Sequence, residues 1–377
     1  MLVLHIGWAI GVSTESGHFR PKPRSGEQGR GTLEPMDVLA IAALISHRSD
    51  LFSLGWSSHR LRKAVANGEM VCLYPGWFAT STAWQAWFPE ERCVAQAIAV
   101  ARAGHVGDDA VSHVTAGAML GWPLYGVRPQ RTHISGPTRD GNTRGRSLAH
   151  HRRPAVTDTI EIAGIRVTNP IRTASDLLGY LPRDAAVAVA DAALREVAWD
   201  AVSHQYDQTR ADAWRSEILA SPALQKGQRG VAQARWVTHF ADGRAQLPGE
   251  SVSRLRLHQL GFAPPRLQVP IALSSGRFAY VDFGLDDIDA WGEFDGEGKY
   301  TDAAMLRAAS TAQALVAEKW REDEIRAITG RRIVRWGMSH IRSPQTLGTR
   351  LAQFNASAPL TSRRVTSIGD ESRPRRT

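Results

Sequence analysis

The stretch at residues 280–300, YVDFGLDDIDAWGEFDGEGKY, combines short apolar runs with closely spaced acids. Its pattern predicts two neighbouring strands, the first carrying Asp282 and the second carrying Glu293, with Asp295 two residues later. Side chains alternate between the faces of a strand, so Glu293 and Asp295 project to the same side, and Asp282 joins them if the strands pair as a hairpin. Clustered carboxylates repel one another unless a cation or a proton lies among them. The stretch therefore predicts a Mg²⁺ site on a sheet.

Helices and strands are predicted to surround this stretch in a regular order. A helix is predicted at 249–260, because Val252, Leu255 and Leu260 recur at helical spacing. The remaining predicted elements are strands at 267–273, 277–283 and 290–294, a long helix at 302–328, a strand at 331–336 and a helix at 345–354. The predicted series is therefore helix, three strands, helix, strand, helix.

That series, the EFDG–KY block and the run EKWREDEIRAITGRRIVRW at 318–336 resemble the PD-(D/E)XK nuclease superfamily. The resemblance spans residues 248–354 and is strongest to the branch related to very-short-patch-repair endonucleases. It implies a restriction-endonuclease-like core of the αβα type with a mixed sheet. It also implies that an acid on the first helix, Glu250, and the strand acids Asp282 and Glu293 hold Mg²⁺ for the hydrolysis of DNA phosphodiesters.

One position departs from the founding motif of that superfamily. The motif has Lys two residues after the strand Glu, whereas this chain has Asp295, as related proteins with a Glu-x-Asp-Gly sequence often do. Lys299 and Lys319 are alternative sources of the positive charge, because a long ammonium side chain can reach a site from several positions. The resemblance therefore names Asp295, Lys299 and Lys319 as further candidate catalytic residues.

Three alternatives to a DNA-cleaving site remain open on the sequence. The acids of the two strands can be turn and surface acids, as is predicted for the three aspartates within 286–289. The nuclease-like region can instead retain its fold only to bind DNA or a protein partner, without catalysis. RNA is an alternative substrate, because phosphate chemistry is common to both nucleic acids.

The first folded segment, residues 36–88, is predicted to be a winged helix-turn-helix. Helices are predicted at 37–45, 51–54 and 59–66, followed by a hairpin of strands at 70–73 and 77–80. The Ser57-Ser58 pair supplies an N-cap for the third helix, and Asn67-Gly68 ends it. The apolar stripe of this helix consists of Leu61, Ala64 and Val65. Its other face and flank carry the candidate DNA-contacting residues His59, Arg60, Arg62 and Lys63.

A basic helix followed by a tight hairpin is how winged helix-turn-helix modules bind DNA, although a solvated cationic face is the alternative. The run SSHRLRKAVANGEMVCLYPGWFAT at 57–80 resembles the N-terminal domain of AbiEi-type antitoxins. That resemblance continues through the middle region. It implies a DNA-binding autoregulator of a toxin–antitoxin operon, with a cognate toxin as a further partner.

The middle region, residues 89–200, is predicted to be AbiEi-like and mixed α/β. Helices are predicted at 94–102, 114–120 and 184–196, strands at 132–136 and 165–168, and a helix cap at 173–176 (TASD). The arginine-rich loop between the strands either faces nucleic acid or is merely solvated. No metal is predicted at His150-His151, because no further ligand follows at a suitable spacing.

The predicted organisation is that of an α+β multidomain protein. Residues 1–35 are expected to be a disordered arm, or sequence upstream of a start at Met36, and 356–377 a disordered basic tail. Between the middle region and the nuclease-like domain at 246–355, residues 201–245 are predicted to be a polar helical connector.

Composition narrows the classes of partner and compartment. The 377 residues carry a formal net charge of +9 and a pI of ≈ 10.0, which favours polyanionic partners. Two cysteines allow neither a disulfide framework nor a Cys-based zinc site, and they suit a reducing cytoplasm. No segment of the sequence is long and apolar enough to span a bilayer, so no membrane partner is expected.

Overall fold

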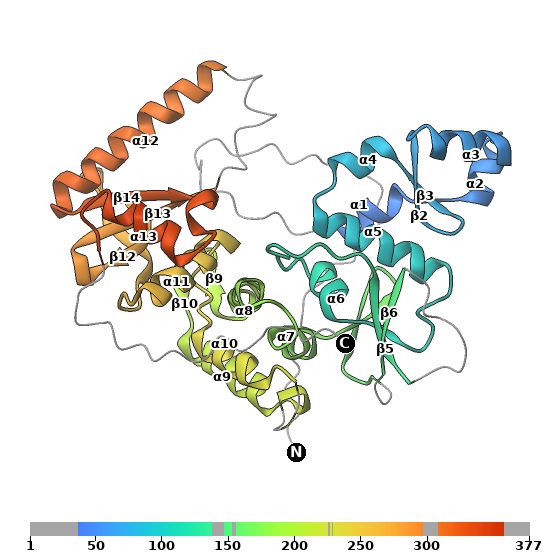
Figure 1. Ribbon diagram of the computed structural model, residues 1–377. Helices are drawn as coiled ribbons and strands as arrows, with labels where there is room; N and C mark the ends of the chain where they lie inside the picture. Colours follow the sequence, from blue (N-terminus) through green and yellow to red (C-terminus); the bar gives the residue numbers. More distant parts are fainter. Residues whose placement is uncertain are drawn as a thin grey trace. The chain divides into compact units, whose positions relative to one another are not determined.

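Thirteen α-helices and four β-sheets make up the part of the chain that the computed structural model describes, which is an α+β protein (Figure 1). The described residues are 37–137, 147–152, 156–224, 227, 229–296 and 308–357, with side chains described throughout except at 308–317. They belong to one compact unit, which spans Glu34–Thr377. The expectations for residues 1–35 and for most of the basic tail lie outside the described residues. None of the described helices combines the length and the apolar character that a membrane span requires.

The N-terminal segment consists of three helices and a small antiparallel sheet. Its elements are α1 (Val38–Ala43), β1 (Ser46–His47), α2 (Arg48–Ser53), α3 (Ser58–Ala66), β2 (Met70–Tyr74) and β3 (Trp77–Thr80), with strand order β1-β3-β2. The Ser57 side chain caps α3 by accepting from the backbone N–H of Arg60 at 3.1 Å. The helices and the hairpin predicted here are confirmed, whereas β1 was not predicted.

The middle region is built on a mixed five-stranded sheet of order β6-β5-β4-β8-β7. Its elements are α4 (Ser81–Ala86), α5 (Pro89–Arg102), β4 (Ala110–Val111), α6 (His113–Met119), β5 (Thr132–Gly136), β6 (Leu148–Arg152), β7 (Thr159–Ile162), β8 (Ile165–Thr168), α7 (Pro170–Leu178) and α8 (Arg183–Ala198). The predicted cap at 173–176 is wrong. Helix α7 begins at Pro170 with Asn169 as its N-cap, and the hydroxyl of Thr173 donates to the carbonyl of Thr168 instead.

A predominantly helical segment follows α8. It contains β9 (Trp199–Asp200), β10 (Gln205–Tyr206), α9 (Gln208–Ala220), the 3₁₀ helix η1 (Pro222–Leu224) and α10 (Val231–Phe240). Trp214, Ile218 and Val237 are buried in the same core as α7 and α8, so α9 and α10 pack onto the middle region.

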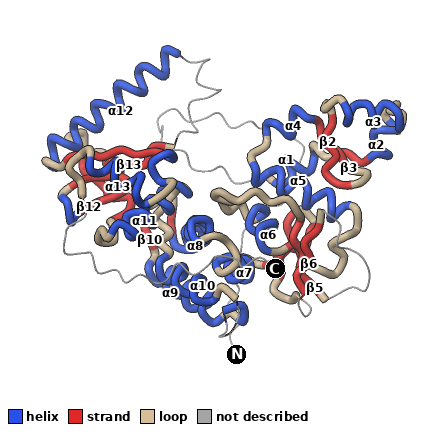
Figure 2. The backbone as a smooth tube through the Cα atoms, viewed as in Figure 1, coloured by secondary structure: helices blue, strands red, loops and turns tan. Residues whose placement is uncertain are grey.

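The C-terminal region places helices on both faces of a four-stranded sheet, which Figure 2 shows in red. Its elements are α11 (Pro248–Leu260), β11 (Arg266–Ala272), β12 (Phe278–Leu285), η2 (Asp286–Ile288), β13 (Ala290–Asp295), α12 (Ala308–Thr329), β14 (Arg332–Gly337), η5 (Met338–Ile341) and α13 (Pro344–Ala352). The order is β11-β12-β13-β14, antiparallel except that β14 runs parallel to β13. Residues of α11 and α13 fill one core, and Ile325 of α12 packs in another. The predicted series of elements is confirmed.

Helix α11 belongs to two cores at once. Its Leu255 is buried with residues of α8, whereas Val252 and Leu257 are buried with residues of the C-terminal sheet. Arg254 of α11 also forms two hydrogen bonds, of 2.7 and 2.8 Å, with the buried carboxylate of Asp191 on α8. Helix α11 therefore connects the C-terminal sheet to the middle region, because one part of its apolar surface is buried by each.

Candidate functional site

Two of the expected metal ligands, Glu250 and Asp282, lie beside one another and share a hydrogen-bond donor. Glu250 is in the first turn of α11 and Asp282 is on β12, and both are buried. The Nε2 of Gln268, on β11, lies 3.2 Å from Glu250 Oε2 and 3.3 Å from Asp282 Oδ1. A side-chain amide nitrogen carries two hydrogens, so it can serve both carboxylates. The structure therefore brings Glu250 and Asp282 together, and it adds Gln268, which the sequence analysis missed.

The backbone at Gln268 is in the left-handed region, with φ of 49°. This conformation is uncommon for a residue with a Cβ and costs free energy. It also breaks the alternation of β11, because Leu267 and Val269 pack in different cores although they are two residues apart. The distortion coincides with the buried amide that bridges two carboxylates, and strained backbone of this kind clusters at functional sites.

The second carboxylate oxygen of Asp282 also accepts a hydrogen bond. Oδ2 accepts from the backbone N–H of Phe294 at 2.8 Å, so the side chain of β12 bonds to the backbone of β13. The ring of Phe294 in turn approaches α11 so closely that a Cβ at Gly249 would lie 2.0 Å from it. Gly249 therefore permits the contact that places Glu250 next to the two strands.

Glu293 makes its described contacts with arginines. It is buried on β13, and its Oε2 lies 2.9 Å from Nη2 of Arg335, its partner in the register of parallel β14. The Nη2 of Arg321, on α12, lies 3.9 Å from Glu293 Oε1. Among the described residues, the cations beside Glu293 are therefore the guanidinium groups of Arg335 and Arg321. Of the two lysines predicted for this role, Lys319 is exposed on α12 and Lys299 lies outside the described residues. Asp295 is exposed at the end of β13.

The charges around these carboxylates shift one another's protonation equilibria. Burial lowers the pKa of Arg195, on α8, to about 10, although the charge of Glu250 acts in the opposite direction. Burial by itself would lower the pKa of Arg335. The negative charges of Glu293, Glu322 and Glu318 have the larger combined effect, so the pKa of Arg335 is above its ordinary value. Burial raises the pKa of Glu318, yet the nearby Arg321 and Arg335 hold it below its usual range. Arg195, Arg335 and Glu318 therefore remain charged at neutral pH.

The donor set fits Mg²⁺ only in part. No group of three or more His, Cys, Asp or Glu side chains within the described ranges is arranged to hold a metal ion. Glu250, Asp282 and Glu293 therefore do not form such a group; Glu293 contacts Arg335, and Glu250 and Asp282 share Gln268. Mg²⁺ prefers oxygen ligands and is commonly bound by one or two carboxylates together with water and phosphate oxygens. The pair of Glu250 and Asp282 meets that smaller requirement.

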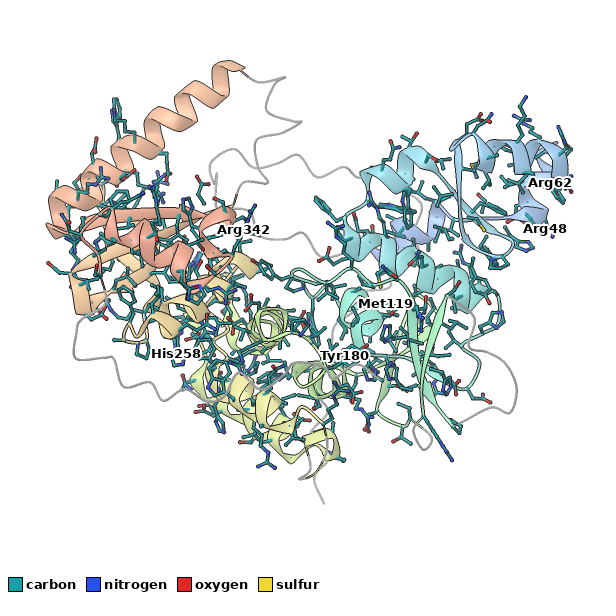
Figure 3. The ribbon with its side chains drawn as sticks, in the orientation of Figure 1. Arg48, Arg62, Met119, Tyr180, His258 and Arg342 are labelled. Carbon is teal, nitrogen blue, oxygen red and sulfur yellow. The ribbon has the colours of Figure 1, made fainter. Side chains whose placement is uncertain are left out.

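Helix α3 presents a separate cationic surface. Leu61 and Ala64 are buried beneath it in a small cluster with Leu51 and Met70. The four expected DNA-contacting residues, His59, Arg60, Arg62 and Lys63, are all exposed. The guanidinium carbon of Arg60 lies 4.2 Å from the ring centroid of Trp56, and Arg62 is labelled in Figure 3. The predicted division of α3 into an apolar and a cationic face is confirmed.

A histidine cluster in the middle region was not predicted. A hydrogen bond of 2.9 Å joins Nδ1 of His133 to Nε2 of His151, and the ring of His113 stacks on that of His151 with centroids 3.5 Å apart. Burial, followed by the charge of Arg131, lowers the pKa of His133 to about 4. His150-His151 was the available signal, but its partners are distant in the sequence. Tyr180, labelled in Figure 3, packs edge-on against all three rings.

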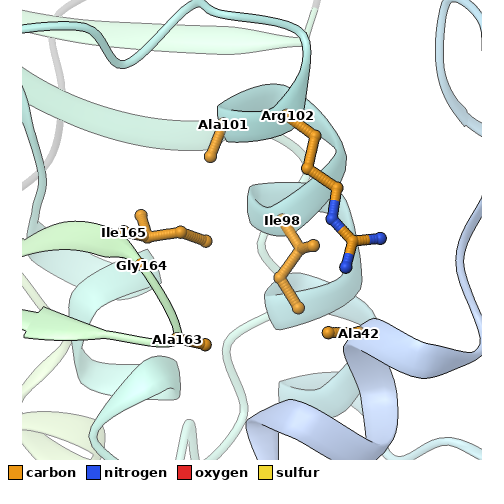
Figure 4. A pocket seen from close by; sticks show the side chains of 7 residues that line it. All are labelled: Ala42, Ile98, Ala101, Arg102, Ala163, Gly164 and Ile165. Carbon is orange, nitrogen blue, oxygen red and sulfur yellow. The ribbon is translucent and has the colours of Figure 1, made fainter.

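A pocket of about 200 Å³ lies between α1, α5 and the turn joining β7 to β8 (Figure 4). Its lining consists of Ala42, Ile98, Ala101, Arg102, Ala163, Gly164 and Ile165. The guanidinium of Arg102 donates to the carbonyl of Ile45 at 3.2 Å and lies 5.6 Å from the ring centroid of Trp77. The charged residue of this lining is thus used in packing, and the pocket offers no reactive group.

Comparison with known proteins identifies two relatives from Mycobacterium tuberculosis. They are Uncharacterized protein MT2308, from strain CDC 1551 / Oshkosh, and Uncharacterized protein Rv2248, from strain ATCC 25618 / H37Rv. Each is 35% identical over 147 residues, which is 39% of this chain and 49% of the relative. The chain thus matches about half the length of these relatives. No family model matches the chain.

Proposed function

We propose that this chain is a DNA-binding protein whose C-terminal region hydrolyses DNA phosphodiesters with Mg²⁺, in a defence or toxin–antitoxin setting. The observation that carries the proposal is the buried contact of Glu250 and Asp282 with one amide, at a strained position of the sheet. The two carboxylates supply oxygen ligands of the kind that Mg²⁺ prefers.

The N-terminal segment supplies the proposed DNA contact. The proposal is supported by the segment's order of helix, strand, two helices and hairpin, with β1 completing a three-stranded sheet, because a winged helix-turn-helix needs a pair of helices followed by a hairpin. In such modules the second helix of the pair enters the major groove. Helix α3 is the second helix of the pair in this segment, and it exposes the cationic side chains that would contact phosphates.

The C-terminal region supplies the proposed chemistry, and the proposal is supported by the region's series of helix, three strands, helix, strand and helix, the series on which the resemblance to PD-(D/E)XK nucleases rests. Glu250 and Asp282 would hold Mg²⁺, with Glu293 as the third candidate ligand. Bound there, Mg²⁺ would polarise a phosphate oxygen and lower the pKa of an attacking water. Gln268 would orient the two carboxylates, and the arginines beside Glu293 would stabilise negative charge on the phosphate.

Cleavage assays on the full chain test this proposal. Supercoiled, linear, mismatched and single-stranded DNA should be cut with Mg²⁺ or Mn²⁺ and left intact in EDTA. Asp282→Ala and Glu293→Ala should each abolish cutting and preserve DNA binding, because each removes an oxygen ligand and a charge that repels phosphate. Asp323→Asn, which removes an exposed acid of α12, should cut as the wild type does. Cutting that survives both alanine substitutions would show that the site is wrong.

A noncatalytic regulator is the second candidate function. Asp295 stands where the founding motif has Lys, and the Arg335 guanidinium contacts Glu293. A nuclease-like fold with this arrangement would bind DNA or a cognate toxin without hydrolysis. Metal-independent binding to its own promoter, with no cleavage of any DNA tested, would favour this function. Co-purification with a toxin encoded beside it would identify the second partner.

A further inference from the structure

Arg335 connects the candidate ligand Glu293 to helix α12. Its Nη2 lies 2.9 Å from Glu293 Oε2 and 3.1 Å from one oxygen each of Glu318 and Glu322. Nη2 carries two hydrogens, so it cannot form full hydrogen bonds with three carboxylates at once. The two acids of α12 would therefore retain the guanidinium if Glu293 left it.

The arginines of this cluster are incompletely satisfied. The Nε groups of Arg321 and Arg335 are buried and have no hydrogen-bond partner among the residues described. A buried donor without a partner destabilises the arrangement that contains it. Arg321 and Arg335 both bond to Glu318, so the two guanidinium groups are anchored on α12 independently of Glu293. The contact between Arg335 and Glu293 is thus replaceable.

We infer that Arg335 holds Glu293 while no metal is bound and yields it to the metal, with Glu318 and Glu322 retaining the guanidinium. The inference rests on the proposed function, because it takes Glu293 to join Glu250 and Asp282 around Mg²⁺. Arg335 is then a positioning residue. It keeps a buried carboxylate compensated in the free protein, and it competes with the metal for the same oxygen.

Substitutions on the two sides of the cluster should change metal affinity in opposite directions. Arg335→Gln removes the competitor, so the full chain should bind Mn²⁺ about 2- to 5-fold more tightly, the factor expected for losing one partly exposed ion pair. Glu318→Gln combined with Glu322→Gln removes the alternative partners, strengthens the hold of Arg335 on Glu293 and should weaken Mn²⁺ binding. Calorimetry or electron paramagnetic resonance of Mn²⁺ measures both changes without requiring cleavage.

Matched variants separate this effect from a change in overall charge. Arg332→Gln removes one positive charge from the same strand, where Arg332 donates to the carbonyl of Ile288. Asp323→Asn combined with Glu324→Gln removes two negative charges from the same helix. Both controls should leave Mn²⁺ affinity close to that of the wild type. Arg335→Lys keeps the charge on a shorter side chain, so its hold on Glu293 should be weaker and Mn²⁺ binding tighter than in the wild type, which provides a second test if Arg335→Gln unfolds.

Each outcome bears on the inference. The inference is supported if Arg335→Gln binds Mn²⁺ more tightly than the wild type and the variant with both Glu318→Gln and Glu322→Gln binds it more weakly. It is also supported if Mn²⁺ binding is detected only in Arg335→Gln. Wild-type Mn²⁺ binding that neither variant alters overturns the inference and leaves the proposed metal site standing. Absence of Mn²⁺ binding in the wild type and in every variant overturns both.

Discussion

Helix α3 and the contact between α8 and α11 use charged residues in opposite ways. On α3 the cations are exposed, and the helix is stabilised by the apolar stripe beneath them. Between α8 and α11 the charges are buried, as in the pair of Asp191 and Arg254. Exposed charges contribute little to folding and remain available to a partner, whereas buried charges become costly once one partner is lost. The difference separates residues that can be changed freely from residues on which the fold depends.

The largest effect is expected at the buried pair. Asp191→Ala leaves the guanidinium of Arg254 buried and uncompensated, which should lower the free energy of unfolding by about 3–5 kcal/mol. Burial raises the pKa of Asp191, and the charge of Arg254 opposes that rise, so the pair depends on both members. Urea denaturation measures the loss. Arg210→Ala, which breaks an exposed pair with Asp207 and keeps the Asp207 cap of α9, should cost less than about 1 kcal/mol, and equal losses would refute the contrast.

The next effect concerns the amide between the two candidate ligands. Gln268→Ala should weaken Mn²⁺ binding by about 10- to 100-fold, the usual range for residues that orient metal ligands. The physical reason is that Glu250 and Asp282 lose their shared donor. Calorimetric titration measures the affinity, and Gln353→Ala, outside this cluster, is the control. Unchanged affinity would mean that Gln268 serves packing rather than the site.

Acid should destabilise the protein through His133. Its pKa is about 4 in the folded chain, below the ordinary value of 6.5, because burial disfavours the charged ring. The unfolded state therefore binds the proton first, and the stabilisation present above pH 6.5 is lost as the pH falls toward 4. The slope approaches about 1.4 kcal/mol per pH unit. Urea unfolding at stepped pH should show this slope reduced in His133→Gln and retained in His59→Gln, which changes an exposed ring.

The smallest effect on folding is expected on α3. Reversing Arg62 and Lys63 to Glu should change the unfolding free energy by no more than about 0.5 kcal/mol, because both side chains are exposed. DNA binding should weaken, and the plot of log affinity against log salt should flatten by about 1.8 if two phosphate contacts are lost. Fluorescence anisotropy at several salt concentrations measures the slope. An unaltered affinity and slope would remove α3 from the proposed DNA contact.

Local sequence signals were sufficient for most elements. The stripe of α3, its Ser57 cap and the hairpin after it are determined by spacing within a few residues, and each was predicted correctly. The cap at 173–176 failed because Asn169 and Pro170 begin α7 earlier, and the hydroxyl of Thr173 bonds back to β8. Strand β1 was missed because its two residues become a strand only by pairing with β3.

The candidate site was only partly accessible from the sequence. The sequence identifies Asp282 and Glu293 as candidate ligands, because they lie in two strands on either side of a short turn. It predicts that Glu293 shares one Mg²⁺ with Asp282 and Glu250, and it does not predict the contact of Glu293 with Arg335. The contact of Glu293 with Arg335 comes from the parallel pairing of β13 with β14, two strands that α12 separates in the sequence. Gln268 carried no signal, because its role depends on a left-handed backbone and on two carboxylates from other elements.

The sequence by itself determined the order of helices and strands in the C-terminal region, the cationic face of α3 and the acids of the C-terminal strands, because periodicity and capping act over short separations. Only the tertiary structure decided which charges meet. Asp191 and Arg254 are 63 residues apart, and His133 and His151 belong to different strands. A side chain's partner depends on how distant elements pack, and burial then determines the free energy of that contact.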